Sequence, residues 1–386
     1  MTTLDRPRNL SRRAFGALGM AALVSPLLPF ASRAGTRQLQ WTYIGNANWS
    51  GRDSHDVFRH RSRHFLSNGW ANGQVLAHDL WCADDAAQLN WTLVNSATPY
   101  DHQSPIVDFQ DALVACAETQ WRSTDGGVNW TNIGTTPFAR VGQYYSQPNV
   151  RTIGKLVSTG KKLIFLNATG IWETTDPTDV NAWVQKVVNP AYGWRKFFNV
   201  APDAGRFILW GGVKEETNTP PDGTYNGPML QEKLRFVDDV WSLDPETYKL
   251  ERISDRTPWG PLIWEAYCPH EGEHVISCGY NKVPSGNVDT AKANRRETWI
   301  TKDFLKADLV QSDYYPIPTH FPAIVSSVRP PMMYSPASDG NQDDPNGYRL
   351  SAAAKPKVRI VLLGGNRNNG PSSVDATVSS QILTLE

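Results

Sequence analysis

The chain has 386 residues, and its 38 lysines and arginines balance 38 aspartates and glutamates. A formal net charge of zero, with no basic run beyond the N-terminus, makes nucleic acid and anionic membrane surfaces poor candidate partners. Hydrophobic residues make up 40% of the chain and aromatic residues 11%, which is ordinary for a globular protein with a core. The 29 glycines and 27 prolines are spread along the chain, as turn residues are in an all-β protein.

The N-terminal residues 1–34 carry an export signature. Ser11–Phe15 (Ser-Arg-Arg-Ala-Phe) is similar to a twin-arginine export motif, and a weakly apolar run over 16–28 follows it. Small residues in Ala31–Ala34 suit a cleavage site. A membrane anchor is the alternative, but the run is shorter than the ~20 residues that a span needs. The resemblance implies twin-arginine export to the periplasm or outside, with no stable membrane insertion after cleavage. We therefore predict a signal peptide over 1–34 and a single domain over 35–386.

A strand with a central tryptophan recurs through this domain, followed by an aspartate and then by a second short strand. Such a period predicts a repeat architecture. The copies are His78–Asp84, Trp121–Trp130, Gly170–Asp176, Asp238–Asp244, Glu297–Asp303 and Ser379–Leu385. Apolar strands that end in small residues precede five of them, at Leu113–Ala117, Lys162–Leu166, Arg206–Trp210, His274–Cys278 and Arg359–Leu363.

One copy contains Ser123-x-Asp125-x-Gly127-x-x-Trp130, which resembles the Asp box of sialidase-like propellers. There the box is the turn between the third and fourth strands of a blade. An aspartate in a tight turn accepts backbone N–H bonds, and glycine supplies the positive φ. The double glycines after two of the apolar strands resemble kelch repeats. Together these features imply an all-β propeller in which the box is scaffold, away from the ligand-binding face.

The last copy, Ser379–Leu385, ends the chain before a partner strand can follow. Leu39–Gly45 has the pattern of Trp130–Gly134, the strand after the box. We therefore predict that the N-terminal strand completes the last blade and closes the ring, which also removes exposed strand edges. This arrangement predicts a six-bladed β-propeller, with seven blades as the alternative.

The four cysteines belong to an exported chain, in which disulfides can form. Cys268 and Cys278 are predicted on the first and second strands of one blade, but not directly opposite each other, so a bridge there stays open. Cys82 and Cys116 are predicted as small core residues of adjacent blades. The sequence has no Cys-x-x-Cys spacing, so no metal site is predicted, and it identifies no cofactor.

Loops between the second and third strands differ in length around the predicted ring. They are short in the first three blades, at Gly69–Gln74, Glu118–Gln120 and Asn167–Gly170. They are long in the last three, at Val213–Phe236, Tyr280–Arg296 and Asn366–Val378. A further insertion, Ser335–Lys355, is expected between the first two strands of the last blade, on the opposite face. Long loops are often functional, so we predict a wall beside one part of the channel mouth; surface loops without a role are the alternative.

The starts of the inner strands are expected to line a central pocket. The residues predicted there are His55 (with His60 as alternative), Asp101, His102, Tyr144, Tyr145, Trp194, Arg195, Trp264, Glu265 and His320. Aromatic faces stack on sugars, arginine grips carboxylates, and histidine or tyrosine transfers protons. We predict catalytic roles for His102, Tyr145, Arg195 and His320. Substrate binding is predicted for Tyr144, Trp194, Trp264 and Glu265.

These residues favour an exported glycan-active protein, either a hydrolase or a lyase on an acidic polysaccharide. A non-catalytic propeller that binds carbohydrate or protein is one alternative. The kelch resemblance adds another, a small-sugar isomerase or mutarotase. The arginine triad of sialidases is not matched, because Arg59, Arg61 and Arg63 occur in an unlike context, so sialidase activity is not predicted.

Overall fold

The computed structural model is built almost entirely of β-strands. It describes residues 35–71, 75–100, 104–138, 154–167, 170–193, 195, 197–215, 234–281, 295–311, 323–328, 335–336, 348–349, 358–365 and 380–385.

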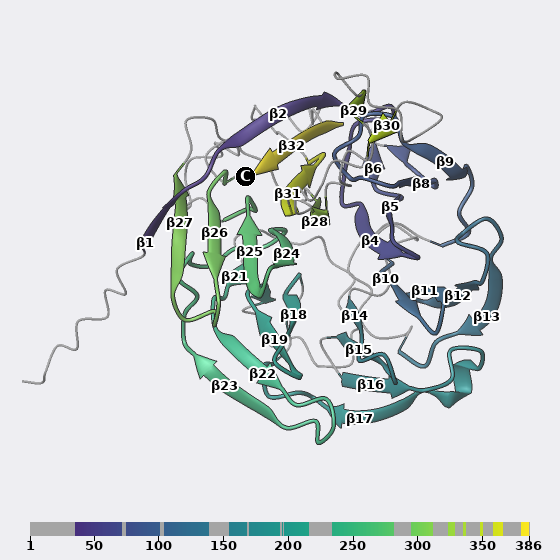
Figure 1. The fold of residues 1–386 in the computed structure, drawn as a ribbon. Coiled ribbons are helices and arrows are strands. Elements are labelled where there is room, and N and C mark those ends of the chain that lie inside the picture. Colours follow the sequence, from purple (N-terminus) through teal and green to yellow (C-terminus); the bar gives the residue numbers. More distant parts are fainter. Residues whose placement is uncertain are drawn as a thin grey trace, which may run out of the picture. The chain divides into compact units, whose positions relative to one another are not determined.

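Six antiparallel sheets lie in a ring, each with one strand at the centre and one at the perimeter (Figure 1). The all-β, six-bladed prediction is confirmed, and the seven-bladed alternative is wrong. From the inside outward, blade one is β4 (Asp56–His60), β5 (Arg63–Ser67), β8 (Leu80–Ala83) and β9 (Thr92–Asn95). Blade two is β10 (Ile106–Phe109), β11 (Ala112–Cys116), β12 (Thr119–Ser123) and β13 (Thr131–Thr135). Blade three is β14 (Gly154–Ser158), β15 (Leu163–Asn167), β16 (Gly170–Thr174) and β17 (Val184–Val188).

The other three blades carry additions. Blade four is β18 (Asn199–Asp203), β19 (Arg206–Trp210), β22 (Val240–Leu243) and β23 (Leu250–Ser254). Blade five is β24 (Ala266–His270), β25 (Glu273–Ser277), β26 (Thr298–Thr301) and β27 (Ala307–Gln311), with β1 (Gly35–Gln38) outside it. Blade six is β28 (Ala323–Val328), β31 (Val358–Leu363), β32 (Gln381–Leu385) and β2 (Trp41–Asn46). Shorter elements are β3 (Arg52–Asp53), β6 (Trp70–Ala71), β7 (Val75–Leu76), β20 (Val213–Glu215), β21 (Leu234–Phe236), β29 (Ser335–Pro336), β30 (Tyr348–Arg349) and the 3-10 turn η1 (Val180–Ala182).

Burial explains the sequence pattern of the blades. All residues of β11 and of β15 are buried, so these second strands are continuous apolar runs rather than alternating ones. The perimeter strand β17 is mostly exposed and has polar residues. In blades one to four the register of the third and fourth strands shifts immediately before the central tryptophan, for example between Gln120 and Trp121. The recurring tryptophan thus marks a repeated β-bulge.

The turn over Ser123–Trp130 holds blade two against blade one. Asp125 accepts hydrogen bonds from the Asn129 backbone N–H (2.9 Å) and the Ser123 hydroxyl (2.8 Å). Gly127 has φ of 91°, and a Cβ there would lie 2.1 Å from a methyl of Leu80 in blade one. Trp130 packs against the buried cluster of blade one that contains Leu80. The turn therefore has the backbone bonding and the positive φ that its sequence predicted, and it adds a contact between two blades.

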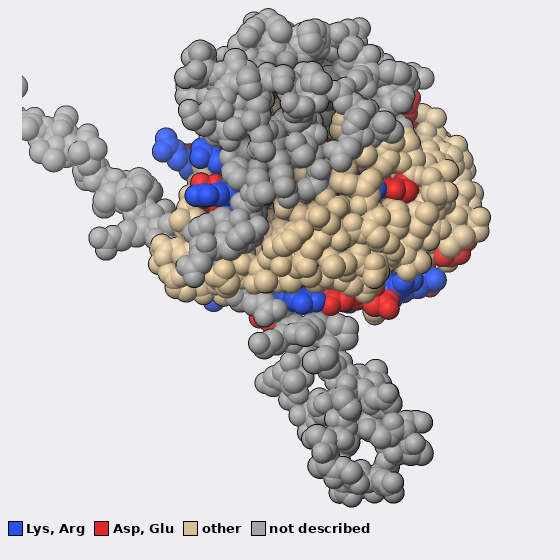
Figure 2. Space-filling model, turned by 90° about the horizontal axis from the view of Figure 1, so that it is seen from above, with Lys and Arg blue, Asp and Glu red and all other residues tan. Residues whose placement is uncertain are grey.

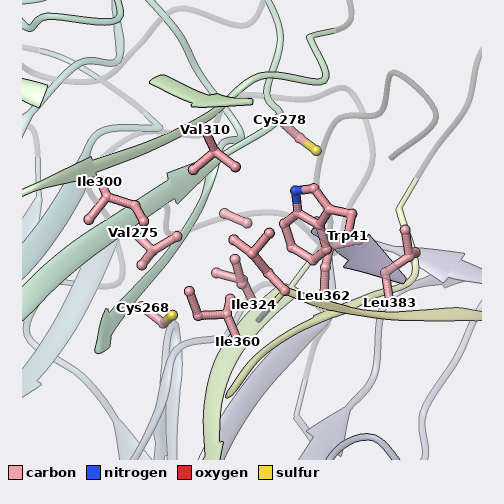
Figure 3. Close-up of a cluster of buried hydrophobic side chains, with 12 residues drawn as sticks. Trp41, Cys268, Val275, Cys278, Ile300, Val310, Ile324, Ile360, Leu362 and Leu383 are labelled. Atoms are coloured by element: carbon pink, nitrogen blue, oxygen red, sulfur yellow. The ribbon is translucent and has the colours of Figure 1, made fainter. Parts of the chain in front are cut away.

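Both ends of the chain build blade six. β2 pairs with β32, with Trp41 opposite Leu385 and Asn46 opposite Gln381, as predicted. Trp41 is 1% exposed, packs in a cluster shared with blade five, and its indole N–H lies 3.3 Å from the Thr298 hydroxyl (Figure 3). The ring is therefore closed by a strand pairing and by a buried tryptophan.

A strand that the sequence did not predict adds to this closure. β1 pairs in parallel with β27, with Gly35 opposite Asp308, and becomes a fifth strand of blade five. Arg37 on β1 donates two hydrogen bonds to the Glu273 carboxylate, at 2.6 and 3.0 Å. Because β1 joins blade five and β2 joins blade six, the N-terminal segment ties the two blades together.

The four cysteines are buried free thiols. Cys268 lies opposite Val275, so Cys278 falls beyond its reach along the strand pair, as expected. The predicted long loop over 213–236 begins and ends as the β20–β21 hairpin, and 216–233 lies outside the described residues, as do 282–294 and 366–379. The insertion in blade six does lie between its first two strands, β28 and β31.

Acidic and basic side chains are interspersed on the described surface seen in Figure 2, in keeping with the zero net charge. Among the described residues, no helix is long and apolar enough to span a membrane.

Candidate functional site

A cavity of about 290 Å³ lies at the centre of the ring, lined by residues at or beside the starts of all six inner strands. This is the position at which the sequence predicted a pocket. Its polar lining includes Ser54, His55, Asp56, Lys155, Asn199 and Glu265. Because each inner strand starts beside the cavity, its first residues decide the chemistry of one wall.

The ionisable groups of the cavity come from every second blade. Asp56 is on blade one, Lys155 on blade three, and Glu265 directly precedes the inner strand of blade five. Blades two and six contribute mainly apolar side chains such as Ile106 and Ile324. No ion pair within 4.0 Å joins any two of the three charged groups in the described part of the chain. The cavity therefore has charge-bearing walls separated by less polar ones.

Burial shifts all three groups towards their neutral forms. It raises the pKa of Asp56 to about 6, against the influence of the Lys155 ammonium. It also raises the pKa of Glu265 above its ordinary value. Burial lowers the pKa of Lys155, while Asp56 and Glu265 act in the other direction. Perturbed titratable groups gathered in one pocket are characteristic of functional sites.

A repeated turn aims the chain into the cavity. Ser54, Phe197 and Trp264 have φ of 54°, 55° and 58°, and each lies two residues before an inner strand. Positive φ is uncommon for non-glycine residues and costs about 1 kcal/mol or more. The next residue in each turn is buried, His55 in blade one and Glu265 in blade five. Strain is thus stored at three corresponding positions around the cavity.

Glu265 is held at one carboxyl oxygen. The Trp210 indole N–H donates to Oε1 at 2.9 Å, whereas Oε2 is buried and has no hydrogen-bond partner. The side chain is 6% exposed in total. A buried oxygen without a partner is costly, so a bound ligand that donates a hydrogen bond to Oε2 would remove an existing penalty.

His55 is a second group of the lining with buried polar atoms that have no partner of normal hydrogen-bond geometry. It is 6% exposed, and neither ring nitrogen has a partner of normal hydrogen-bond geometry. Burial lowers the pKa of His55 to about 3, and the nearby Arg52 guanidinium acts in the same direction. The imidazole is therefore neutral at physiological pH, with one donor and one acceptor available to a ligand.

Arg195 is bound within the protein. Its guanidinium donates to both carboxylate oxygens of Asp239 at 2.5 and 2.9 Å, to the Tyr192 carbonyl from Nε and Nη2, and to the Gly211 carbonyl from Nη1. These bonds use all five of its N–H groups. Arg195 is 1% exposed and does not belong to the cavity lining. The predicted grip on a ligand carboxylate would therefore require these bonds to break.

Blade one repeats the arrangement with Arg52. Its guanidinium binds both oxygens of Asp79 and donates to the carbonyls of Ser50 and Asn68. In both blades the aspartate also accepts a bond from the tryptophan two residues later, Trp81 or Trp241. We call each set of arginine, aspartate and tryptophan a latch. The signal was in the sequence, since each arginine follows an aromatic residue by three positions and each aspartate begins Asp-x-Trp.

The other predicted residues divide into two groups. Trp264 and Glu265 line the cavity. Six further predictions lie outside the described residues: Asp101, His102, Tyr144, Tyr145, Trp194 and His320. Sequence reasoning missed Asp56 and Lys155. Asp56 directly follows the predicted His55, and Lys155 is the lone charge of the strand Gly154–Ser158, whose start was placed some residues too early.

Comparison with known proteins finds no match to this chain, either among protein-family models or among curated proteins. Within the described residues, no three histidines, cysteines or acidic residues are grouped to hold a metal ion. The functional argument therefore depends on the cavity and its side chains.

Proposed function

We propose that the protein is an exported propeller of the kelch and Asp-box type that isomerises a small acidic sugar in its central cavity. The observation that carries the proposal is the arrangement of Asp56, Lys155 and Glu265 on alternate blades around one cavity. Two carboxyl groups with raised pKa values supply an acid and a base, and one ammonium supplies an anion site.

The size of the cavity supports a small substrate. A volume of about 290 Å³ is at the lower end of the ~300–1,000 Å³ range of small-molecule pockets. It suits a single sugar better than the interior of a polysaccharide chain. This favours the isomerase over the hydrolase or lyase. Trp264 and Tyr267 add half-buried aromatic rings to the wall, and such rings pack on the apolar face of a sugar.

Exchange of sugar anomers needs only one acid and one base. Asp56, ionised above about pH 6, removes the proton of the anomeric hydroxyl. Glu265, whose pKa is raised by burial, gives its proton to the ring oxygen as the bond between that oxygen and the anomeric carbon breaks. The open-chain carbonyl compound rotates and closes on its other face, and both protons return. Lys155 holds the carboxylate of the sugar, an interaction strengthened by burial.

The proposal is tested by following anomer exchange in acidic and neutral monosaccharides with exchange NMR. Asp56→Asn and Glu265→Gln should each slow exchange about 10²-fold or more, as loss of an acid or base does. Lys155→Met should weaken binding of acidic sugars more than of neutral ones. Asp238→Asn is the matched control, because burial also raises the pKa of Asp238 but this residue lies outside the cavity lining.

The alternatives give different results in the same experiments. If the wild type instead releases reducing ends from an acidic polysaccharide, and this activity is lost in Asp56→Asn and Glu265→Gln, the protein is a hydrolase or lyase rather than an isomerase. Sugar binding by the wild type without turnover of any kind would leave a binding module. If the carboxyl variants exchange anomers as fast as Asp238→Asn, the cavity is not the site.

A further inference from the structure

We infer that Trp210 is a positioning residue for Glu265, because its indole N–H occupies Oε1 and confines the carboxylic proton to Oε2. The inference rests on the proposed function, in which Glu265 is the acid, but it can be tested without a substrate. It assigns a role to a residue of blade four that does not itself line the cavity.

The hydrogen-bond chemistry decides which oxygen carries the proton. An indole N–H is a donor only, so the oxygen that it contacts must act as an acceptor. At 2.9 Å the Trp210 Nε1–Oε1 contact is of normal length. The carbonyl oxygen of a carboxylic acid accepts hydrogen bonds better than its hydroxyl oxygen, so the indole contact favours the O–H on Oε2, the oxygen that has no hydrogen-bond partner within the protein. A proton held there is available for transfer.

The tryptophan cannot easily turn away. It is fully buried, and its ring lies 4.9 Å from Phe304 and 5.3 Å from Tyr267, measured between centroids. The glutamate is confined as well. A Cβ on Gly279 would lie 3.0 Å from the Glu265 Cβ, and the Asn199 amide donates to the Glu265 carbonyl at 3.3 Å. Both partners of the contact are thus fixed by their surroundings.

Several groups act on the Glu265 charge. Burial disfavours the carboxylate, whereas the nearby backbone and Asn199 amide groups, the Trp210 indole N–H and the Lys155 ammonium favour it. His55 and Tyr267 share the cavity wall, and Asp56 acts on Lys155. Because the indole stabilises the ionised form, its removal should raise the pKa of Glu265 further. It should also allow the proton to occupy either oxygen.

The experiment is the titration of Glu265 by carboxyl NMR in glutamate-labelled protein, with Glu265→Gln to assign the signal. Trp210→Phe keeps an aromatic ring and should raise the midpoint by about 0.5–1 pH unit, as loss of one hydrogen bond implies. Trp259→Phe is the matched control, since Trp259 lies in the same aromatic cluster, 6.2 Å from Trp210 between ring centroids. An unchanged midpoint in Trp210→Phe, or equal shifts in both variants, would overturn the inference.

A second measurement uses the wild type, so it does not depend on whether a Trp210 variant folds. In the wild type, the Trp210 indole proton resonance should shift with the same midpoint as the Glu265 carboxyl, and this shift should vanish in Glu265→Gln. An indole resonance that does not shift as Glu265 titrates contradicts the inference. These results are distinct from failure of the proposed function. If the wild type has no sugar activity but Glu265 and the Trp210 indole titrate together, the isomerase proposal is wrong and the positioning role of Trp210 is kept.

Discussion

Asp56 opposes folding once the pH is high enough to ionise it. Its folded-state pKa of about 6 lies above the ordinary value of 3.8. The folded protein therefore binds more protons than the unfolded chain between these values, and stability from this group is lost as the pH rises through about 6. Residues at functional sites often carry such a cost.

We predict that Asp56→Asn stabilises the protein by roughly 1–3 kcal/mol at about pH 8, because the amide cannot ionise. The gain should shrink towards zero near pH 4, where the aspartate is protonated in the folded protein. Urea unfolding at both pH values measures it. An equal gain at both would mean that ionisation is not the cause.

At the scale of the element, the two latches fix the segments that enter the inner strands of blades one and four. Arg52 and Arg195 each lie four residues before such a strand, β4 or β18. Their aspartates directly precede the third strands of the same blades, β8 and β22, so each latch joins the segments that lead into the first and third strands. The cavity wall is thereby tied to the blade behind it.

Breaking one latch should be costly. Arg195→Met or Asp239→Asn is expected to destabilise by about 3–5 kcal/mol, because each leaves a buried charge without its partner. The double variant Arg195→Met/Asp239→Leu should cost less than the sum. Arg206→Met is the control, since the Arg206–Asp203 pair is largely exposed on the arginine side and should contribute less than about 1 kcal/mol. Denaturant unfolding of the four variants checks this; additive single effects would contradict a shared latch.

The latches also show where sequence reasoning succeeded and where it failed. The Asp box and the tryptophan repeats are short motifs whose contacts are mostly local, so they predicted blades and closure correctly. The role of Arg195 depends on Asp239, which is 44 residues away. Its buried position and its partner could not be inferred from neighbours in the sequence. For the same reason β1 was missed: its partner, β27, is distant, and Gly35–Gln38 has no apolar pattern.

At the scale of the whole molecule, buried histidines make stability depend on pH. Burial lowers the pKa of His55 to about 3 and that of His64 to about 4. Both are neutral in the folded protein, whereas the unfolded chain takes up protons below about pH 6.5. The stability that they contribute is therefore complete above this pH and is lost on acidification. Asp56 has the opposite effect, because its contribution to stability grows as the pH falls from about 6 to 4. The pH dependence of wild-type stability is therefore the sum of these two opposing contributions.

A variant separates these opposing effects. His55→Phe keeps a ring of similar shape and removes one proton uptake, so its stability between about pH 6 and 4 should fall less steeply than that of the wild type. The expected difference in slope is about 1.4 kcal/mol per pH unit. Thermal or urea unfolding across this range measures it. Parallel curves for variant and wild type would show that His55 titrates normally.

The pairing of β2 with β32 also links the fold to protein synthesis. Of the four strands of blade six, the ribosome makes the outer strand β2 first and its neighbour β32 last. Until Gln381–Leu385 leaves the exit tunnel, Trp41 lacks Leu383 and Leu385, which belong to its buried cluster. A chain cut short by premature termination therefore presents an open sheet edge that other chains can pair with. Burial of Trp41 in this cluster therefore requires translation to have reached Leu385.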